Sequence, residues 1–408
     1  MKCRHCNEDV SKVLIDLGSA PPSNAYLTAL TIRRPEKWFP LKVLICEHCW
    51  LVQAEAYSRA AELFNEEYAY FSSFSDEWLA HSQKYVSEAI GRFDLTDKSF
   101  VVEVASNDGY LLQYIKSAGI PCLGIEPTAS TASASRLKGI ETIEEFFGTS
   151  LAKRTAKERG KADLMIANNV LAHVPDINDF VSAFASLLKP QGVATFEFPH
   201  LLLLIKGGQF DTIYHEHFSY LSFTTTLEIL KSNGLDVFDV KKIGTHGGSL
   251  RVFAQKSDSG KHIVSEHVSE LLKAEEDSGM RHMSFYDGFQ KAAEKVKNDF
   301  LYFLLEAKQE GKTVAAYGAA AKGNTLINYA GIHSDLISFV VDRNPAKQGK
   351  YMPGSRIPIV DEKHLKDMKP DYIVVLPWNL KSEIMIQLKY IQEWGGKFVT
   401  AVPDLNIS

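Results

Sequence analysis

The chain has 408 residues, of which 45% are hydrophobic and 23% are charged, and its formal net charge is −5. This length allows two or three domains, and the composition is typical of a globular protein. The absence of a long basic run argues against nucleic acid as the main partner. No apolar run is long enough to span a bilayer, so we expect no membrane partner. No secretory signal precedes the first cysteine, so we expect a cytoplasmic protein.

Four cysteines near the start of the sequence form two short pairs. Cys3 and Cys6 are one pair, and Cys46 and Cys49 are the other, so each pair places two thiols on one tight turn. Two such turns supply the four sulfur ligands of a tetrahedral Zn²⁺ site. Because four protein ligands leave no open position for chemistry, we predict a structural zinc. A redox dithiol or a disulfide is the alternative. The fifth cysteine, Cys122, lies in an apolar run and is expected in the core.

The middle of the chain alternates between predicted helices and strands. A helix is predicted over residues 76–90 from the spacing of its apolar residues. Short, β-branched segments follow, and we expect strands at residues 100–104, 121–125, 163–167 and 193–198. Strands that alternate with helices at this spacing predict a parallel, doubly wound α/β sheet.

The last third of the chain begins with a charged region that is almost free of glycine and proline. Residues 263–310 predict long connecting helices, and strand and helix signals alternate again from residue 313. We expect strands there at residues 313–317, 336–341, 372–376 and 397–402. The prediction therefore has three parts: a zinc-binding subdomain (1–75), an α/β domain (76–260) and a helical connector with a second, smaller α/β domain (261–408).

A cofactor site is predicted at the first two strands of the middle domain. Ligands of parallel α/β sheets bind where the carboxyl ends of strands meet helix N-termini. The first strand carries Glu103 and ends in the turn Ser106-Asn107-Asp108-Gly109, and the second ends at Glu126-Pro127. A carboxylate at the second position accepts hydrogen bonds from both ribose hydroxyls of an adenosine ligand. The ligand is therefore either a dinucleotide or S-adenosyl-L-methionine.

The charge of the turn separates these two cofactors. A dinucleotide needs a G-x-G-x-x-G turn for its pyrophosphate, whereas only Gly109 is present and Asp108 would repel the phosphates. The sulfonium and ammonium groups of S-adenosylmethionine suit the acidic side chains of Glu103 and Asp108 better. We favour S-adenosylmethionine, with a dinucleotide and a turn without ligand as the alternatives.

The motifs, taken in order, resemble the zinc-containing sugar C-methyltransferases, which methylate nucleotide-linked 4-keto-6-deoxy sugars. Ala105 and Ser106 stand where that family more often has Gly-Cys, and His215 replaces a residue that is often acidic. Each motif is weak alone, but together they cover nearly the whole chain. Besides the cysteines, they are Tyr68-x-Tyr70-x-Ser72-Ser73, Ser106-Asn107-Asp108-Gly109, Ala167-Asn168-Asn169-Val170-Leu171-x-His173, Tyr214-His215-Glu216-His217-Phe218, His246-Gly247-Gly248, Tyr317-Gly318-Ala-x-Ala-Lys322 and Asp342-x-x-Pro345-x-Lys347-Gln348-Gly349.

The resemblance implies a fold and an activity. The fold is α/β: a class I, Rossmann-like methyltransferase domain with an N-terminal zinc-binding subdomain and a C-terminal second Rossmann-like α/β domain. The activity is S-adenosylmethionine-dependent methylation of C-3 or C-5 of a nucleoside-diphosphate 4-keto-6-deoxy sugar. The resemblance implies thymidine diphosphate as the carrier, with other nucleotides as alternatives. The residues expected to contact the cofactor are Glu103, Ser106, Asn107, Asp108, Gly109, Glu126, Pro127, Asn168, Asn169, Tyr70 and Ser73.

Methylation of a carbon beside a ketone requires a base and a group that stabilises the enolate oxygen. Histidine is the side chain best suited to the first role at pH 7, so His217 is our first candidate for the base and Tyr214 the second. Glu216 is expected to orient a partner or to bind the sugar, and His173 to stabilise the enolate or to position the ketone. If this segment were a strand, His215 and His217 would share one face, where a metal ion is an alternative.

The second α/β domain is predicted to hold the nucleotide half of the substrate. A turn of small residues opens a helix there, and its lysine and backbone amides suit a diphosphate. Two other functions remain open: O- or N-methylation of a small molecule, and a non-catalytic zinc-bearing scaffold that binds nucleotides. The residues expected to contact the substrate are His246, Gly247, Arg251, Tyr317, Gly318, Lys322, Asn324, Asp342, Lys347 and Gln348.

Overall fold

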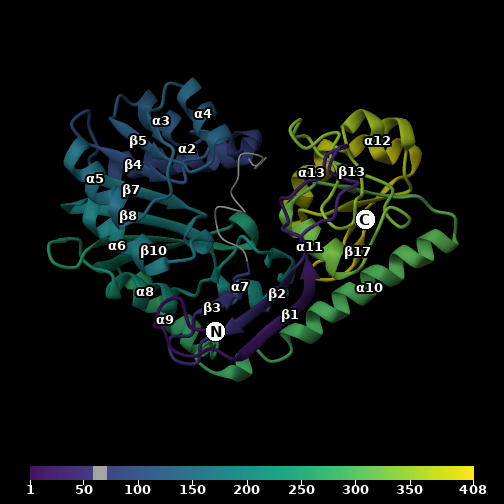
Figure 1. The fold of residues 1–408 in the computed structure, drawn as a ribbon, viewed down its shortest axis with the longest axis horizontal. Helices are drawn as coiled ribbons and strands as arrows, with labels where there is room; N and C mark the ends of the chain where they lie inside the picture. Colours follow the sequence, from purple (N-terminus) through teal and green to yellow (C-terminus); the bar gives the residue numbers. More distant parts are fainter. Residues whose placement is uncertain (58–70) are drawn as a thin grey trace.

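The computed structural model describes residues 1–57 and 71–408, and three sheets organise this part of the chain (Figure 1). A seven-stranded sheet lies in the middle of the sequence and a six-stranded sheet at its C-terminal end. A four-stranded sheet near the N-terminus lies between them, at the base of the view. None of the described helices combines the length and the apolar character that crossing a bilayer requires.

The seven-stranded sheet has the order β10-β11-β8-β7-β4-β5-β6. Its five parallel strands are β4 (Val101–Val104), β5 (Cys122–Ile125), β6 (Thr142–Ile143), β7 (Ala162–Asn168) and β8 (Leu188–Pro199). The strand β11 (Ser249–Lys256) is antiparallel to both of its neighbours, β8 and β10 (Leu235–Ile243). Parallel pairing of the first strands confirms the α/β prediction, whereas β10 was not predicted.

Helices cover both faces of this sheet, and the sequence of β4 shows why. Val101 packs against α2 (Asp76–Arg92) and α3 (Leu112–Ser117), because its side chain shares a core with theirs. Val102 and Val104 point to the other face and pack with α5 (Thr149–Arg159), α6 (Ile177–Leu187) and α8 (Phe223–Ser232). Strands that are buried on both faces are mostly apolar, and β4 is so apart from Glu103, which is why these strands were visible in the sequence. The helix α4 (Ala129–Leu137) follows β5.

The six-stranded sheet has the order β14-β13-β12-β15-β16-β17. In chain order this is 3-2-1-4-5-6, the arrangement of doubly wound nucleotide-binding folds, and only the last strand is antiparallel. The second Rossmann-like unit is therefore confirmed. Its elements are β12 (Val314–Tyr317), α11 (Ala321–Tyr329), β13 (Val340–Val341), β14 (Ile359–Val360), α12 (Glu362–Met368), β15 (Tyr372–Val375), α13 (Lys381–Gln387), β16 (Lys397–Thr400) and β17 (Asn406–Ile407).

The four-stranded sheet joins the two larger units. Its strands are β1 (Lys12–Ala20), β2 (Phe39–Ile45), β3 (Val52–Ala54) and β9 (Ser219–Tyr220), and the last of these belongs to the middle of the sequence. The connector contains α9 (Glu266–Asp277) and α10 (Phe289–Gln309), and α10 lies against β1 (Figure 1). One apolar core includes residues of β1, α7 (Leu201–Lys206), α10 and β12. The N-terminal residues thus share a core with both neighbours, which the sequence did not indicate; the three-part division stays a prediction.

Candidate functional site

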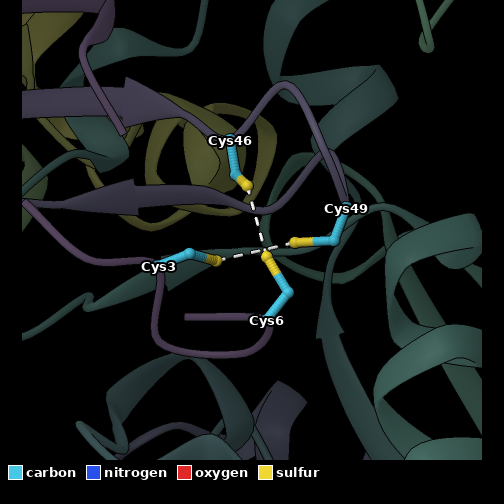
Figure 2. A group of neighbouring side chains, drawn as sticks. All are labelled: Cys3, Cys6, Cys46 and Cys49. Carbon is cyan, nitrogen blue, oxygen red and sulfur yellow. Dashed lines mark hydrogen bonds between the residues drawn. The ribbon is translucent and has the colours of Figure 1, made fainter. Parts of the chain in front are cut away.

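The four cysteines form one cluster, and two turns of the same geometry build it (Figure 2). In the first turn the backbone N–H of Asn7 donates to the carbonyl of Cys3, and in the second that of Trp50 donates to Cys46. Asn7 and Trp50 both have a positive φ, 62° and 59°, so the backbone reverses its direction directly after each cysteine pair. The second turn connects β2 to β3, which brings it beside the first.

The sulfur positions fit zinc. The Sγ atoms of Cys3 and Cys49 lie 3.5 Å apart, as do those of Cys6 and Cys46, and all four lie within 4.8 Å of one another. A disulfide would require about 2.05 Å, whereas two sulfurs bound tetrahedrally to one Zn²⁺ at about 2.3 Å lie about 3.8 Å apart. The cysteines are free thiols in this structure, so the disulfide alternative does not apply. The cluster holds structural zinc.

The turn after β4 has an unusual backbone that the sequence did not reveal. Ala105, Asn107 and Gly109 all have positive φ values, of 53°, 49° and 76°. This left-handed conformation is the one that glycine adopts most easily, and it costs other residues roughly 1–2 kcal/mol. At Gly109 a side chain would also collide with Ile140, whose Cδ1 atom would lie 2.5 Å from an added Cβ. The turn thus has the tight conformation of a glycine-rich loop, although two of the three positions carry other residues.

The same edge of the sheet contains an excess of buried polar atoms without partners. Among the described residues fifteen buried side-chain atoms make no hydrogen bond, and seven of them belong to five residues of this edge. Such atoms are costly unless something pairs with them, so their concentration here indicates a ligand-binding position. The five residues are Glu103, Ser106, Asp108, Asn168 and Asn169.

The electrostatics of this edge suit a cationic ligand. Glu103 is fully buried, and burial raises the pKa of its carboxyl group well above the usual value. The phenol of Tyr110 lies nearby and lowers that pKa, but it makes no hydrogen bond of ordinary geometry with the carboxylate. An ammonium group would stabilise the ionised form of Glu103. The donor set therefore fits S-adenosylmethionine.

Glu126 holds the turn from the neighbouring strand. Its Oε2 atom accepts a hydrogen bond from the backbone N–H of Asn107, and its Oε1 atom accepts one from Thr128, both at 2.9 Å. Burial raises the pKa of Glu126, and these two hydrogen bonds lower it. Each oxygen keeps a second lone pair, so the carboxylate can also accept from ribose hydroxyls. Pro127 is half-buried directly after it.

The segment before α2 closes over the turn. The backbone N–H of Ser72 donates to Oδ1 of Asn107 at 2.9 Å. The Nζ atom of Lys138 lies 2.7 Å from the hydroxyl of Ser73 and 3.4 Å from Oδ2 of Asp108. Lys138 therefore connects these two residues. The structure thus brings Ser73 to the predicted cofactor turn. Tyr70, the other expected contact from this segment, lies outside the described residues.

Three of the four candidate catalytic residues, Tyr214, Glu216 and His217, lie together on one turn between η3 (Phe210–Thr212) and β9, and the fourth, His173, ends η2 (Leu171–His173). The hydroxyl of Tyr214 is 2.8 Å from Nε2 of His217, and the backbone N–H of His217 donates to the carbonyl of Tyr214. The Nδ1 atom of His217 is 2.8 Å from the carbonyl oxygen of Thr212. A carbonyl oxygen only accepts hydrogen bonds, so Nδ1 carries the proton and Nε2 presents a lone pair to the phenol.

Two buried neighbours complete this cluster. Nδ1 of His173 donates to the carbonyl of Glu216 at 2.9 Å, and burial lowers the pKa of His173 to about 4, so it is a neutral donor. Burial raises the pKa of Glu216 to about 7, although the amide of Asn24 donates to its carboxylate at 2.9 Å and lowers it. Because His173 follows Asn168 and Asn169 at the end of β7, it links the cofactor edge to the catalytic turn. The hydrogen bond from Asn24 to Glu216 was not predicted from the sequence.

The metal alternative at His215 and His217 does not fit the structure. These residues form a turn and not a strand, and Nε2 of His215 faces the backbone carbonyls of Phe39 and Pro40 at 3.3 and 3.2 Å. The two imidazoles therefore do not share a face. Within residues 1–57 and 71–408, the cysteine cluster is the one group of side chains with metal-binding geometry.

The predicted substrate residues of the second α/β unit fall into two sets. Asn324, Asp342, Lys347 and Gln348 shape loops: for example, Asp342 accepts hydrogen bonds from the backbone N–H groups of Ala319 and Asn344, both at 2.8 Å. Tyr317 accepts a hydrogen bond from Gln387. Gly318 allows a close approach, because an added Cβ would lie 2.5 Å from Pro377.

Lys322 forms the second set, because it faces the middle domain. Its Nζ atom donates to Asn379 at 2.7 Å and lies 4.7 Å from the ring centre of Trp378. The indole N–H of Trp378 donates in turn to Asp211, a fully buried residue of η3, at 2.7 Å. Gly247 lies against the same indole, since an added Cβ would come within 2.8 Å of it. Asp211 and Trp378 lie outside the sequence motifs and were missed.

Arg251 does not have the surroundings expected of a substrate contact. It is buried on β11, where its guanidinium forms an ion pair with Glu197 and a hydrogen bond with His81 and lies over the ring of Tyr85. Its charge is thus already neutralised inside the sheet. For His246, only the backbone is described, as part of η4 (Thr245–Gly247).

Comparison with known proteins places this geometry in a family. Three family models match consecutive parts of the chain: "Putative zinc binding domain" (residues 3–64), "Methyltransferase domain" (residues 78–240) and "C-methyltransferase C-terminal domain" (residues 244–403). The ubiquinone biosynthesis O-methyltransferase of Bordetella avium (strain 197N) is 30% identical over 98 residues, which are 24% of this chain and 41% of that protein.

Solved structures resemble the chain over less than half of its length. The PH0226 protein from Pyrococcus horikoshii OT3 is 14% identical, with a TM-score of 0.39, and the match covers 46% of this chain and 95% of that one. The magnesium protoporphyrin IX methyltransferase from Synechocystis PCC 6803 with bound SAM is 17% identical, with a TM-score of 0.33 and coverage of 45% and 82%.

One relative matches from end to end. The C-methyltransferase NovU of Streptomyces niveus is 35% identical over 406 residues, which cover 100% of this chain and 96% of the relative. An identity of this size across all three parts shows the family: the chain is one of the zinc-containing, S-adenosylmethionine-dependent C-methyltransferases.

Proposed function

We propose that the enzyme methylates C-3 or C-5 of a nucleoside-diphosphate 4-keto-6-deoxy sugar, with thymidine diphosphate as the carrier, in the cytoplasm. The observation that carries the proposal is the pair formed by Tyr214 and His217. The tautomer of His217 is fixed by the carbonyl of Thr212, so Nε2 accepts the phenol proton of Tyr214, and the two side chains form one proton-accepting pair. A base of this kind suits removal of a proton from the carbon beside a ketone, whereas methylation of a hydroxyl or amine needs no such carbon acid.

Each catalytic residue has a role in this reaction. His217 removes the proton from the sugar carbon once the phenol of Tyr214 has moved off Nε2. Tyr214 would instead be the base if it passes its own proton to Nε2 as its oxygen takes the proton of the sugar carbon. His173 is neutral because its pKa is about 4, and its single N–H donates to the carbonyl of Glu216, so here it positions the catalytic turn. The role in enolate stabilisation that the sequence suggested would need the proton on Nε2 instead. Glu216, with a pKa of about 7, can accept a hydrogen bond from a sugar hydroxyl or amine.

The cofactor edge supplies the second half of the site. When S-adenosylmethionine is bound, it supplies the electrophilic methyl group that forms the new carbon–carbon bond. Glu103 and Asp108 would contact its cationic end, and Glu126 its ribose; Ser73, Ser106, Asn107, Gly109, Pro127, Asn168 and Asn169 line this edge, with Tyr70 proposed from the sequence alone.

The nucleotide is assigned to the second α/β unit. Lys322 is the best placed diphosphate contact, because it lies at the start of α11 and faces the catalytic side. Tyr317, Gly318, Asn324, Asp342, Lys347 and Gln348 form the surrounding loops, and His246 and Gly247 approach from the middle domain. For Arg251 we propose a positioning role within the sheet in place of a contact with substrate.

A direct experiment tests the proposal. The purified enzyme is incubated in D₂O with thymidine-diphosphate-linked 4-keto-6-deoxy sugars, first without and then with labelled S-adenosylmethionine. We expect exchange at C-3 or C-5 without the methyl donor, and with it a new carbon-bound methyl group in the NMR spectrum of the product. Methylation of an oxygen or nitrogen without exchange would overturn the proposal. The same sugars on uridine and guanosine diphosphate test the carrier.

A further inference from the structure

A short segment before the catalytic turn determines the protonation geometry of the candidate base. The carbonyl oxygen of Thr212, the last residue of η3, accepts the hydrogen bond from Nδ1 of His217 at 2.8 Å. This acceptor holds the proton on Nδ1, and an imidazole with its proton on Nε2 could not accept from Tyr214. The position of one backbone carbonyl therefore decides whether the candidate base is competent.

The second α/β unit holds the residues on both sides of that carbonyl. Trp378 donates its indole N–H to Oδ2 of Asp211 at 2.7 Å. Thr325, on α11, donates its hydroxyl to the carbonyl of Ile213 at 2.8 Å. Thr212 lies between Asp211 and Ile213, so two hydrogen bonds from the C-terminal part of the chain flank the peptide that faces His217.

The contact with Trp378 is closely fitted. Gly247 lies so close to the indole that an added Cβ would come within 2.8 Å of its Cη2 atom. The side chain of Gln209 donates to the carbonyl of Gly247 at 3.0 Å, which ties the start of this segment to the same place. Asp211 is completely buried, and an unpaired carboxylate there would be costly. The hydrogen bond from Trp378 is therefore a necessary partner and not a casual surface contact.

We infer that Asp211, Trp378 and Thr325 are positioning residues, by which the C-terminal α/β unit sets the tautomer of His217. This inference rests on the proposed function, in which His217 or its partner Tyr214 is the base. The inference adds that the C-terminal α/β unit is needed for removal of the proton from the sugar carbon as well as for affinity for the nucleotide sugar. Lys322, the proposed diphosphate contact, lies on the face of Trp378, so nucleotide binding and base alignment share one side chain.

Two single variants test the inference, and the chain offers a matched control. W378F and T325V each remove one donor with little change of shape. W394F removes an equivalent indole donor, because Trp394 is also half-buried in the C-terminal unit and donates to the carbonyl of Pro370 at 3.0 Å. The thermal midpoint of each variant is compared with that of W394F, which separates a general loss of stability from a specific effect.

The first readout needs no substrate. In protein with ¹⁵N-labelled histidine, the ring signals of His217 are assigned by their loss in H217N. We expect wild type and W394F to show one tautomer with the proton on Nδ1, and W378F and T325V to show a mixture. Unchanged tautomer populations in both variants would overturn the inference. Because this measurement is independent of turnover, a failure of the proposed function would not obscure it.

The second readout is kinetic. In W378F and T325V we expect kcat, and the rate of deuterium exchange at the sugar carbon, to fall at least tenfold, while the Kd for S-adenosylmethionine stays unchanged. In T325V the KM for the sugar nucleotide should also stay the same, since Thr325 is buried against η3. A variant that raises KM alone would show a role in binding only, and the inference would then be wrong.

Discussion

Tyr214 and His217 form a hydrogen-bonded pair in which the direction of the bond is fixed. The phenol oxygen and Nε2 are 2.8 Å apart, and the opposite nitrogen of the imidazole is bound to the carbonyl of Thr212. Since that carbonyl requires the proton on Nδ1, the phenol must donate to Nε2. In this geometry the pair can therefore move one proton from the phenol to the imidazole while the phenol oxygen takes one from the substrate. Nε2 takes a substrate proton directly only after the phenol has moved off it.

Substitution of the two partners distinguishes these routes. If His217 is the base, H217N should lower the rate of deuterium exchange at the sugar carbon by about 10²–10⁴-fold, the usual contribution of general base catalysis. Y214F, which leaves the imidazole lone pair in place, should then cost about tenfold. Equal large losses would indicate that Tyr214 takes the proton first. H282N is the control, because His282 is exposed on the connector; it should leave the rate unchanged.

Much of the fold could be predicted because its strands are buried on both faces. The segment Val101–Val104 is apolar except for Glu103, and Val314–Tyr317 is apolar throughout, which makes each visible without knowledge of its neighbours. The strands of the four-stranded sheet escaped prediction for the opposite reason. In β1 buried and exposed positions are mixed, and β9 has two residues, so both depend on partners that are distant in sequence.

The site was predictable where one short motif contains all the chemistry. The turn from Tyr214 to His217 and the two cysteine pairs are of this kind. Asn24 and Trp378 could not be found in this way, because they reach Glu216 and Asp211 only through folding and lie 192 and 167 residues from them in sequence. Arg251 illustrates the opposite error: a charged residue near a predicted crevice suggested an anion site, but the fold pairs it with Glu197.

The zinc cluster should be required for the stability of the N-terminal sheet. We expect one Zn²⁺ per chain in wild-type protein and in C122S, and a loss of zinc in C46S, because Cys122 lies outside the cluster. The thermal midpoint of C46S should fall, since the binding of structural zinc contributes a free energy comparable to that of a whole domain. Metal content by mass spectrometry and calorimetry check this. A C46S protein that keeps its zinc would contradict the assignment.

The acidic cofactor edge should bind S-adenosylmethionine through charge. In D108N we expect the Kd for the cofactor to rise about tenfold, because one buried carboxylate oxygen of Asp108 has no partner in the described chain and can pair with a cationic ligand. D97N makes the same change of charge at an exposed position before β4 and should leave the Kd unchanged. Isothermal titration calorimetry measures both. Equal effects in the two variants would indicate a general electrostatic contribution and not a contact.

Glu216 should make the protein less stable as the pH rises from about 4.5 to about 7. Its pKa is about 7 in the folded protein and near 4.5 when exposed, because burial opposes ionisation. Over this range the folded state keeps the proton that the unfolded state has lost, so the free energy of unfolding falls with increasing pH. A difference between 4.5 and about 7 corresponds to about 3 kcal/mol in total.

The variant E216Q isolates this effect. Glutamine keeps the shape of the protonated carboxyl group but does not titrate, so wild type should lose stability relative to E216Q between pH 4.5 and 7 and then level off. His173 titrates in the same region, but it bonds to the backbone of Glu216 and is expected to contribute equally in both proteins. E88Q is the control: Lys241 lowers the pKa of the half-exposed Glu88, so its contribution is lost only as the pH falls below about 4.5, and E88Q should run nearly parallel to wild type above that pH. Urea unfolding across this pH range measures all three proteins, and parallel curves for wild type and E216Q would show that Glu216 is already ionised in the folded enzyme.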